Sequence, residues 1–513
     1  MTDFVNRVLE RNENLQVRFL ELQIARKRMK SERGVFEPVL QLGYDHVENE
    51  RENTAEQRRS SGVAIFEEEN DIYSTGIEGL VPTGAKIRLG YSLRDLRNNL
   101  QNPPVGTIFT NQPGAEYQSF AGINLTQPLL KNAWFSSTMA NIRLAGLSEE
   151  VAFQEYRRQL MIIITTAEAS YWNLFLAGEQ VRFFKDSVRV AETLAQDNAA
   201  RLEAGRGSEL EVLEAKSGVA LRRTKLAEAE QKYYEAAAQI AGLMSEVVGE
   251  TVPVLRAKDV PAVKLAPDLD GSAQVALELN PDYLAQTKKL EQENIRLAYT
   301  KNQRLPQLDL RGSYGLNGLG PDVGSSWDDL QTGGFPSWSV GVELNIPLGG
   351  GIKSRNDLAA ARLRKQQALL LLKDVETQMF NSVMMAVKRL RAAQSSVHDY
   401  EQIAAYNQDL LETELKRLEA GKVDSRRVLE VDAAVFESKV AVVESKVQSE
   451  RARLELELVQ GSVLKKRAME LSRKELEQRT IRQLQDAGIP PEASRRFLDD
   501  AAVSLRAHGA SSE

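Results

Sequence analysis

Two long stretches of the chain repeat apolar residues at helical spacing and contain no proline. They run from residue 129 to 252 and from residue 348 to 489. Because proline is the strongest helix breaker, the pattern predicts two regions of very long helix. At 1.5 Å per residue, a helix over residues 140–204 would be a rod of roughly 100 Å. Such a rod cannot bury itself in a globular core, so it has to pack along its length against other helices.

A seven-residue apolar repeat predicts how the second region packs. Its members alternate four- and three-residue steps, which is typical of a coiled-coil seam. They are Leu429, Ala433, Phe436, Val440, Val443 and Val447. The matching face of the first region carries smaller residues, which would let helices approach closely.

Each helical region is interrupted once by the same pentapeptide, Arg-Leu-Glu-Ala-Gly. Its final residues are Gly205 and Gly421, and Val-Leu-Glu follows at the same distance in both copies. Glycine adopts the left-handed conformation at little cost, so both glycines are expected to end an incoming helix. Ser208 and Asp424 can then cap the outgoing helices. Each copy is therefore interpreted as the tip of a long helical hairpin.

Shorter segments alternate apolar and polar residues, as half-buried strands do. They are residues 40–44, 121–125, 308–314 and 338–346. An extra hairpin is expected around residues 82–84, with alternation over residues 87–93 after its turn. One apolar and one polar face fits a sheet between lipid and water. It fits equally a soluble sheet on a core, which is the commoner case on pattern alone.

The whole arrangement occurs twice. Residues 12–38 match residues 280–306 without a gap, and residues 122–128 match residues 341–347. The repeated unit is a helix, two strands, a long helix, a glycine tip and a second long helix. We divide the chain into repeat 1 (residues 1–252), a linker (253–279), repeat 2 (280–464) and a charged C-terminal tail (465–513).

Composition narrows the range of functions. The chain has 513 residues, a net charge of −6 and no cysteine. It lacks the basic surplus expected of a nucleic-acid-binding protein, and it can form no disulfide or cysteine zinc site. His46, His398 and His508 are far apart, and the glycine run at residues 349–351 departs from a phosphate loop at Ile352. With no constellation of nucleophile, base or metal ligands, we expect a protein that is not an enzyme and uses no cofactor.

Membrane and export signals are also absent from the pattern. No apolar run approaches the length of a membrane-spanning helix, so a membrane role would have to be carried by strands. An amphipathic helical pattern starts directly after Met1, without the features of an export signal. We therefore expect either a cytoplasmic protein or one whose export signal is not part of this sequence.

The duplicated tips and the strand-to-helix junctions resemble the TolC-type outer-membrane efflux proteins. The junctions are Gln-Pro-Leu-Leu at residues 127–130 and Ile-Pro-Leu-Gly-Gly at residues 346–350. The resemblance extends from residue 12 to about residue 464. It implies a mainly α-helical chain with a β-barrel part, to which three protomers contribute four strands each. The helices would continue that barrel as a periplasmic tunnel.

The same resemblance implies which residues are functional. Acidic residues after the tips would line a narrow periplasmic entrance, and they correspond to Glu211, Glu214 and Glu430, with Arg427 at the position equivalent to Glu211. Alternatively, these side chains are solvated coiled-coil charges, as most helix carboxylates are. The tips would contact a periplasmic adaptor protein through Gly205, Ser208, Gly421 and Asp424.

We therefore predict a homotrimeric outer-membrane exit duct of a tripartite efflux or type I secretion system. Its partners would be outer-membrane lipid, the adaptor and an inner-membrane pump, with no nucleic acid. The alternative is a soluble coiled-coil scaffold, which the missing export signal favours and the duplicated strands disfavour. Leu418 and Val423 replace the tyrosine and arginine that help to lock the entrance in the family, so no lock of that kind is expected.

Overall fold

The computed structural model confirms the combination of long helices with an antiparallel sheet. The structure describes residues 2–99, 101, 116–205, 207–246, 260, 263, 268–420, 422–423, 425–467 and 469. Part of the predicted linker and nearly all of the predicted tail lie outside these residues.

The chain divides into two compact units, each with parts of both sequence repeats. The sheet unit comprises Gln23–Ala152 and Gln286–Leu372. The helical unit comprises Met1–Leu22, Phe153–Ala285 and Lys373–Glu513. The boundaries drawn between the repeats stay a prediction.

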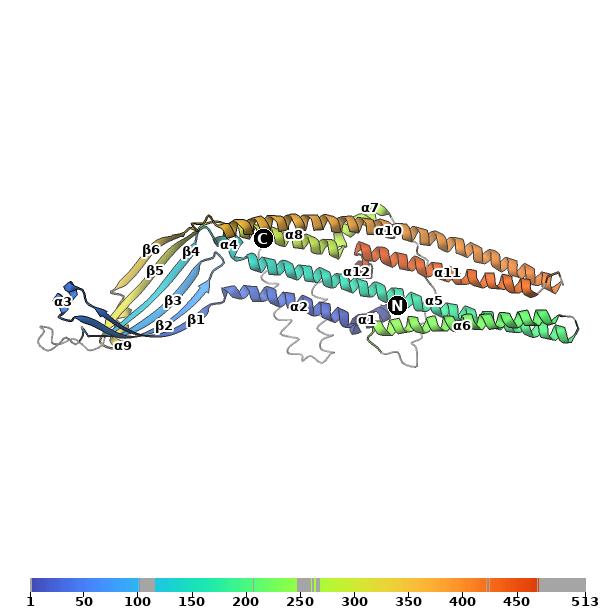
Figure 1. Ribbon diagram of the computed structural model, residues 1–513, viewed down its shortest axis with the longest axis horizontal. Helices are drawn as coiled ribbons and strands as arrows, with labels where there is room; N and C mark the ends of the chain where they lie inside the picture. The colour runs from blue at the N-terminus through green and yellow to red at the C-terminus, as the bar shows by residue number, and fades with distance from the viewer. Residues whose placement is uncertain are drawn as a thin grey trace. The chain divides into compact units, whose positions relative to one another are not determined.

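Six strands form one antiparallel sheet, ordered in space as they are along the chain (Figure 1). They are β1 (Val39–Glu52), β2 (Ile65–Leu80), β3 (Lys86–Asn98), β4 (Glu116–Pro128), β5 (Gln307–Gly320) and β6 (Pro336–Asn345). The hairpin predicted around residues 82–84 is present between β2 and β3, where Gly84 has a φ of +88°. The four strands implied by the resemblance are therefore too few, because this hairpin adds two strands between β1 and β4.

The strand register sorts the side chains onto two faces. One row takes a directly paired residue from each strand in turn: Leu40, Ile77, Leu89, Ile123, Tyr314 and Trp338. Directly paired residues point to the same side of a sheet, so this row defines an apolar face. Its six side chains are between 43% and 73% exposed. The alternate residues form a polar face on the other side of the sheet.

A row of glycines crosses the polar face. Gly76, Gly90, Gly122 and Gly315 are paired in succession across β2, β3, β4 and β5. The Phe120 ring covers the last two of them, and a Cβ atom added to Gly122 would lie 2.6 Å from that ring. Glycine in a strand marks a close approach of this kind. The ring can therefore lie flat across two strands only because both positions lack a side chain.

One short helix packs on the sheet. It is α9 (Val323–Thr332), which contacts β4 and β5 at the end of β5 that is distant from α8. The Ser326 hydroxyl donates to the Ser119 hydroxyl at 2.8 Å, and the Trp327 ring meets the Tyr91 ring with centroids 5.3 Å apart. Since Ser119 and Tyr91 lie on the apolar face, α9 covers part of that face.

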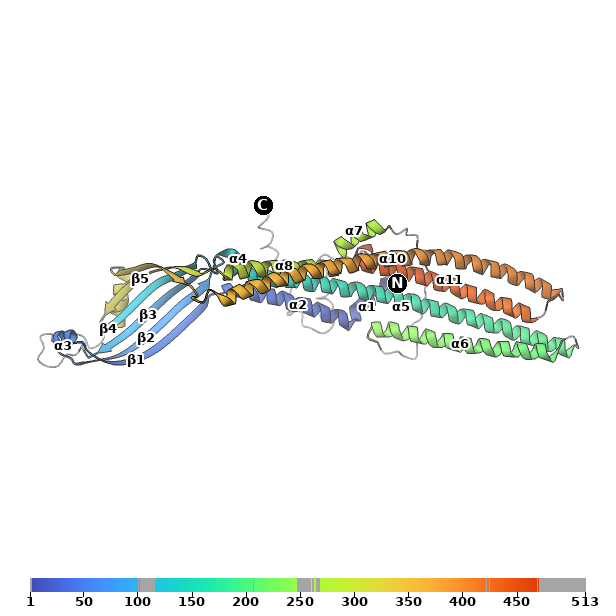
Figure 2. The same cartoon turned by 45° about the horizontal axis from the view of Figure 1, so that its top comes forward.

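The long helices lie where the proline-free stretches predict them. In both views α6 runs beside α5, and α11 runs beside α10 (Figures 1 and 2). The helices are α1 (Thr2–Arg11), α2 (Glu13–Arg33), α5 (Ala140–Glu203), α6 (Glu209–Leu243), α7 (Leu269–Leu279), α8 (Pro281–Gln303), α10 (Ile352–Glu419), α11 (Ser425–Gln460) and α12 (Val463–Lys466). The short helices α3 (Ala55–Ser61), α4 (Trp134–Thr138) and η1 (Gly34–Phe36) lie in the sheet unit. Helix α7 falls inside the predicted linker.

The expectation that no segment is apolar enough to span a membrane is wrong for α5. By length and composition, one 18-residue window of this helix would qualify. However, 67% of the window is buried inside the protein. Met161, Ile164 and Ala167 are almost fully covered. The apolar composition of α5 is therefore explained by packing within the helical unit.

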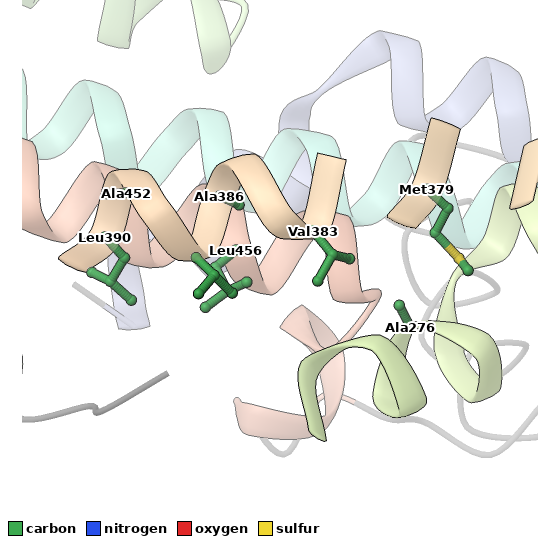
Figure 3. Close-up of a cluster of buried hydrophobic side chains, with 8 residues drawn as sticks. Ala276, Met379, Val383, Ala386, Leu390, Ala452 and Leu456 are labelled. Atoms are coloured by element: carbon green, nitrogen blue, oxygen red, sulfur yellow. The ribbon is translucent and has the colours of Figure 1, made fainter. Parts of the chain in front are cut away.

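Helices α7, α10 and α11 share a small core (Figure 3). Val383 and Leu390 of α10 meet Leu456 of α11, and Ala276 of α7 closes the cluster. Closer to the tip, α11 buries a different stripe from the predicted seam: Val428, Val431, Val435, Ser438, Ser445 and Ser449. The predicted seam is largely half-buried, and its Phe436 meets Phe184 of α5. Because α11 packs against two neighbouring helices, it needs two stripes.

A network of buried charges fastens α12 to the helical unit. Arg467 donates to Glu168 of α5 at 2.6 Å and to Glu457 of α11 at 2.9 Å. Arg453 donates to the same Glu457 carboxylate at 2.6 Å. Glu168 and Glu457 are only 4% and 2% exposed, so both carboxylates depend on these guanidinium groups for compensation.

We expect Arg467→Ala to destabilise the helical unit by about 3–5 kcal/mol, because it leaves two buried carboxylates short of a partner. The measurement is the thermal unfolding midpoint of the purified protein, followed by circular dichroism. Arg18→Ala is the control, since its pair with Glu21 is exposed on a helix surface and should change the midpoint little. Equal shifts in the two variants would show that the network is not needed for stability.

Candidate functional site at the hairpin tips

The first tip has the predicted local structure. Gly205 has a φ of +71°, and its N–H donates to the Leu202 carbonyl at 2.9 Å. The Ser208 hydroxyl accepts from the Glu211 N–H at 3.2 Å, and the Glu211 carboxylate accepts from the Ser208 N–H at 3.2 Å. This reciprocal pair is a capping box, which satisfies two N–H groups at the start of α6. The Glu211 carboxylate is therefore turned back onto its own helix.

The second tip is described only in part. Gly421 and Asp424 lie outside the described residues, so their predicted roles stay predictions. On its incoming side, the Lys422 N–H donates to the Arg417 carbonyl at 2.9 Å. Helix α11 then begins at Ser425.

Charged side chains from both tips gather around Glu430. Its carboxylate lies 3.3 Å from Arg426 and 3.4 Å from Arg427. Arg426 also lies 4.0 Å from Glu214 of the first hairpin. Of the predicted entrance residues, the structure therefore brings Glu214, Arg427 and Glu430 together, while Glu211 is engaged in its own cap.

The buried member of this group was not predicted from the sequence. Glu414 of α10 is 4% exposed, accepts from Arg417 at 3.1 Å and lies 4.0 Å from Arg427. Asn198 occupies the same distance before Gly205 and is also buried, with its amide 3.3 Å from the Glu211 carbonyl. Both copies of the repeat have a polar residue seven positions before the tip glycine, and this shared position could have identified Glu414 from the sequence.

These six side chains form what we call the tip cluster. Its members are Glu214, Glu414, Arg417, Arg426, Arg427 and Glu430. Three carboxylates and three guanidinium groups give it no net charge. Because Arg426 and Arg427 both bind Glu430, this carboxylate is locally neutralised and is not an isolated negative charge.

Arg222 is a second functional candidate that was not predicted from the sequence. It lies on α6, and its Nε donates to the Ser187 hydroxyl of α5 at 2.9 Å. Its Nη2 lies 3.4 Å from both the Leu429 carbonyl and the Asp432 carboxylate of α11. Burial raises the pKa of Asp432, and the Arg222 charge opposes that rise. With side chains only 11% and 17% exposed, Arg222 and Asp432 join the two hairpins just beyond the tip cluster.

One group of side chains has the composition of a metal site. His46 and Glu48 of β1 and Glu69 of β2 have potential ligand atoms within 4.8 Å of one another. All three are exposed, and His46 is 2.9 Å from Asp71. Exposed acidic groups of this kind are common without a metal, so we assign none here.

Comparisons with known proteins agree with this architecture. A family model described as outer membrane efflux protein matches residues 86–246 and 273–462, which is more than half of the chain. Outer membrane protein OprJ of Pseudomonas aeruginosa is 24% identical over 194 residues, covering 38% of this chain and 39% of OprJ. Alkaline protease secretion protein AprF of the same organism is 21% identical over 324 residues, covering 63% of this chain and 65% of AprF.

A solved structure shows the fold. The open state of the MtrE outer membrane channel of Neisseria gonorrhoeae has a TM-score of 0.60 and 16% identity, covering 90% of this chain and 89% of that chain. The chain spans less than two thirds of the length of OprJ or AprF.

We expect Ser208→Ala to loosen the first turn of α6, because the substitution removes the side chain that caps it. A lost cap costs about 1 kcal/mol, which corresponds to roughly fivefold faster amide exchange if local fraying controls exchange. Hydrogen exchange followed by mass spectrometry of peptides over residues 208–213 measures the effect. Ser217→Ala is the matched control, since Ser217 is an exposed serine inside the same helix. Unchanged exchange in Ser208→Ala would contradict the capping role.

Proposed function

Because the chain belongs to the outer membrane efflux protein family, we propose that it is a homotrimeric exit duct of a tripartite efflux or type I secretion system. The observation that carries the proposal is the family match over both sequence repeats. Transport through the duct is passive, and an inner-membrane pump supplies the energy. The duct itself is not an enzyme and has no cofactor.

The apolar face of the sheet supports placement in a membrane. On β6, apolar-face residues run from Pro336 to Leu344, which is roughly 26 Å along the strand at 3.3 Å per residue. Outer-membrane barrels present an apolar band about 25 Å tall, flanked by aromatic residues. On β1 and β2 the apolar face ends at Tyr44 and Tyr73, whose rings lie 5.2 Å apart, and charged residues follow. The polar face would then line the water-filled lumen.

The tips support contact with an adaptor. They are the ends of helical hairpins held rigidly by local caps at Gly205 and Ser208 and by the Arg222 bridge. A rigid tip has little conformational entropy to lose when it binds. We place the periplasmic adaptor at both tips, including Gly421 and Asp424 by symmetry of the repeat.

The tip cluster supports a charged entrance. In a trimer, threefold symmetry places three copies of the cluster around one axis. Since each cluster is neutral, the entrance is a ring of paired charges. Removing one charge from each cluster therefore changes the local charge by three.

The proposal predicts localisation and assembly together. Expressed behind an export signal, the full chain should fractionate with outer membranes, require detergent for release and have the mass of three chains by native mass spectrometry. Expression without the signal is the control for non-specific sedimentation. Recovery of the exported protein as a soluble monomer would contradict the proposal and favour a scaffold.

We expect Glu430→Gln to reduce cation selectivity, because it leaves Arg426 and Arg427 without their shared carboxylate and makes the ring positive. Arg427→Gln should have the opposite effect. Reversal potentials in planar bilayers under a salt gradient measure both. Glu444→Gln, at an exposed position on the same helix, is the control. If the three variants have the same selectivity, the tip cluster does not line the conduction path.

A further inference from the structure

We propose that β2 and β3 are part of the membrane-spanning wall, so that three copies of this chain close a barrel of 18 strands instead of 12. The inference rests on the proposed trimeric duct and concerns its width. The family match begins at residue 86, the first residue of β3, and leaves β1 and β2 outside it. The six strands per copy are given by the strand pairing of this chain.

The apolar face continues without interruption across the added hairpin. Ile77 of β2 is paired with Leu40 of β1, and Leu89 of β3 is paired with Ile123 of β4. Ile77 and Leu89 are 49% and 58% exposed, like the apolar residues of the flanking strands. A hairpin that projected into water would expose this row at a cost of about 25 cal/mol per Å². Lipid contact along all six strands removes that cost.

The polar face is continuous as well. Gly76 of β2 and Gly90 of β3 begin the glycine row that Gly122 and Gly315 complete. Both faces of the hairpin thus match both faces of its neighbours, as they must when every strand crosses the same boundary between lipid and lumen.

The turn of the hairpin lies at the end of the sheet where the long helices start. The Thr83 carbonyl accepts from the Trp134 N–H at 2.9 Å, next to α4. The Thr83 hydroxyl lies 3.2 Å from the Gln127 side chain, at the end of β4. β2 and β3 therefore run almost the whole length of the sheet and return, which distinguishes them from a loop confined to its far end.

Further copies of the chain are the occupants that fit the two open edges. Among the described residues, β1 and β6 each pair with one strand only, and Trp338, Val340 and Val342 of β6 are 73%, 70% and 64% exposed. A long, apolar, unpaired edge has to be covered by another strand. In a meander of six strands β1 and β6 run antiparallel, so β6 of one copy can pair with β1 of the next without breaking the alternation. Since barrel diameter grows roughly linearly with strand number, the barrel would be about 1.5 times wider than one of 12 strands.

Strand counting by cryo-electron microscopy of the trimer in lipid nanodiscs tests the proposal. We expect 18 strands in the full chain. Deletion of residues 65–98 leaves β1 and β4 antiparallel and should give 12 strands, with the diameter reduced about 1.5-fold. A count of 12 in the full-length trimer would overturn the inference and leave the proposed function intact. Absence of any membrane trimer would instead contradict the proposed function.

Disulfide formation tests strand order independently of the deletion variant, because the chain has no cysteine of its own. Leu40→Cys with Ile77→Cys, and Leu89→Cys with Ile123→Cys, should each form a bond in the extracted protein. Leu40→Cys with Ile123→Cys should not, since two strands lie between them and the Cα atoms would be roughly 14 Å apart. A bond in this third pair would show that β1 pairs directly with β4, and the absence of bonds in the first two pairs would contradict the strand order; either result would overturn the inference.

Discussion

Backbone groups at the two edges of the sheet are the constraint on which the rest of this structure depends. Lipid offers no hydrogen bonds, so an edge strand in a membrane needs another strand beside it. β6 is apolar along one face, β1 is apolar on the same face from Leu40 to Tyr44, and the two strands do not pair with each other in the described chain. In the proposed membrane duct, a single chain therefore leaves two strand edges unpaired. Rotational symmetry is the simplest way to complete it, because identical copies supply the same two complementary edges.

In the helical unit, the corresponding requirement is that the long helices align with one another along their length. The face that α11 buries toward the tip includes small side chains such as Ser438 and Ser445. Small residues let helices approach but provide few distinctive shapes. Registry between the hairpins is then defined by polar contacts at a few points, of which Arg222 with Asp432 is the most enclosed near the tips. At the opposite end of α11, Arg467 has the same role between α5 and α11.

Local signals made the long helices, five of the strands and the first tip predictable from the sequence. The hydrogen bonds of Gly205 and Ser208 are made with residues three positions away in the sequence. The repeated pentapeptide ends at the glycine of each tip, so both tips could be recognised. β2 was expected only as half of a hairpin, because Glu67, Glu68 and Glu69 obscure its alternation. Glu414 and Arg222 were missed because their importance lies in contacts with helices distant in sequence. A charge pattern along one helix cannot show which charges another helix will meet, and this is why Glu414 of α10 was not expected beside Arg427 of α11.

The β2–β3 hairpin has a consequence for how such proteins can diverge. The two strands of a hairpin run in opposite directions, so the chain returns to the end of the sheet from which the hairpin started. Insertion of a hairpin therefore preserves the direction of every other strand. In a threefold assembly one insertion in one gene adds six strands at once. The circumference of the wall would then change only in steps of six strands, and intermediate sizes would be inaccessible to a symmetric trimer that keeps antiparallel order. The diameter of the duct would therefore change in whole steps. A single insertion or deletion of a hairpin would alter it, and gradual substitution would not.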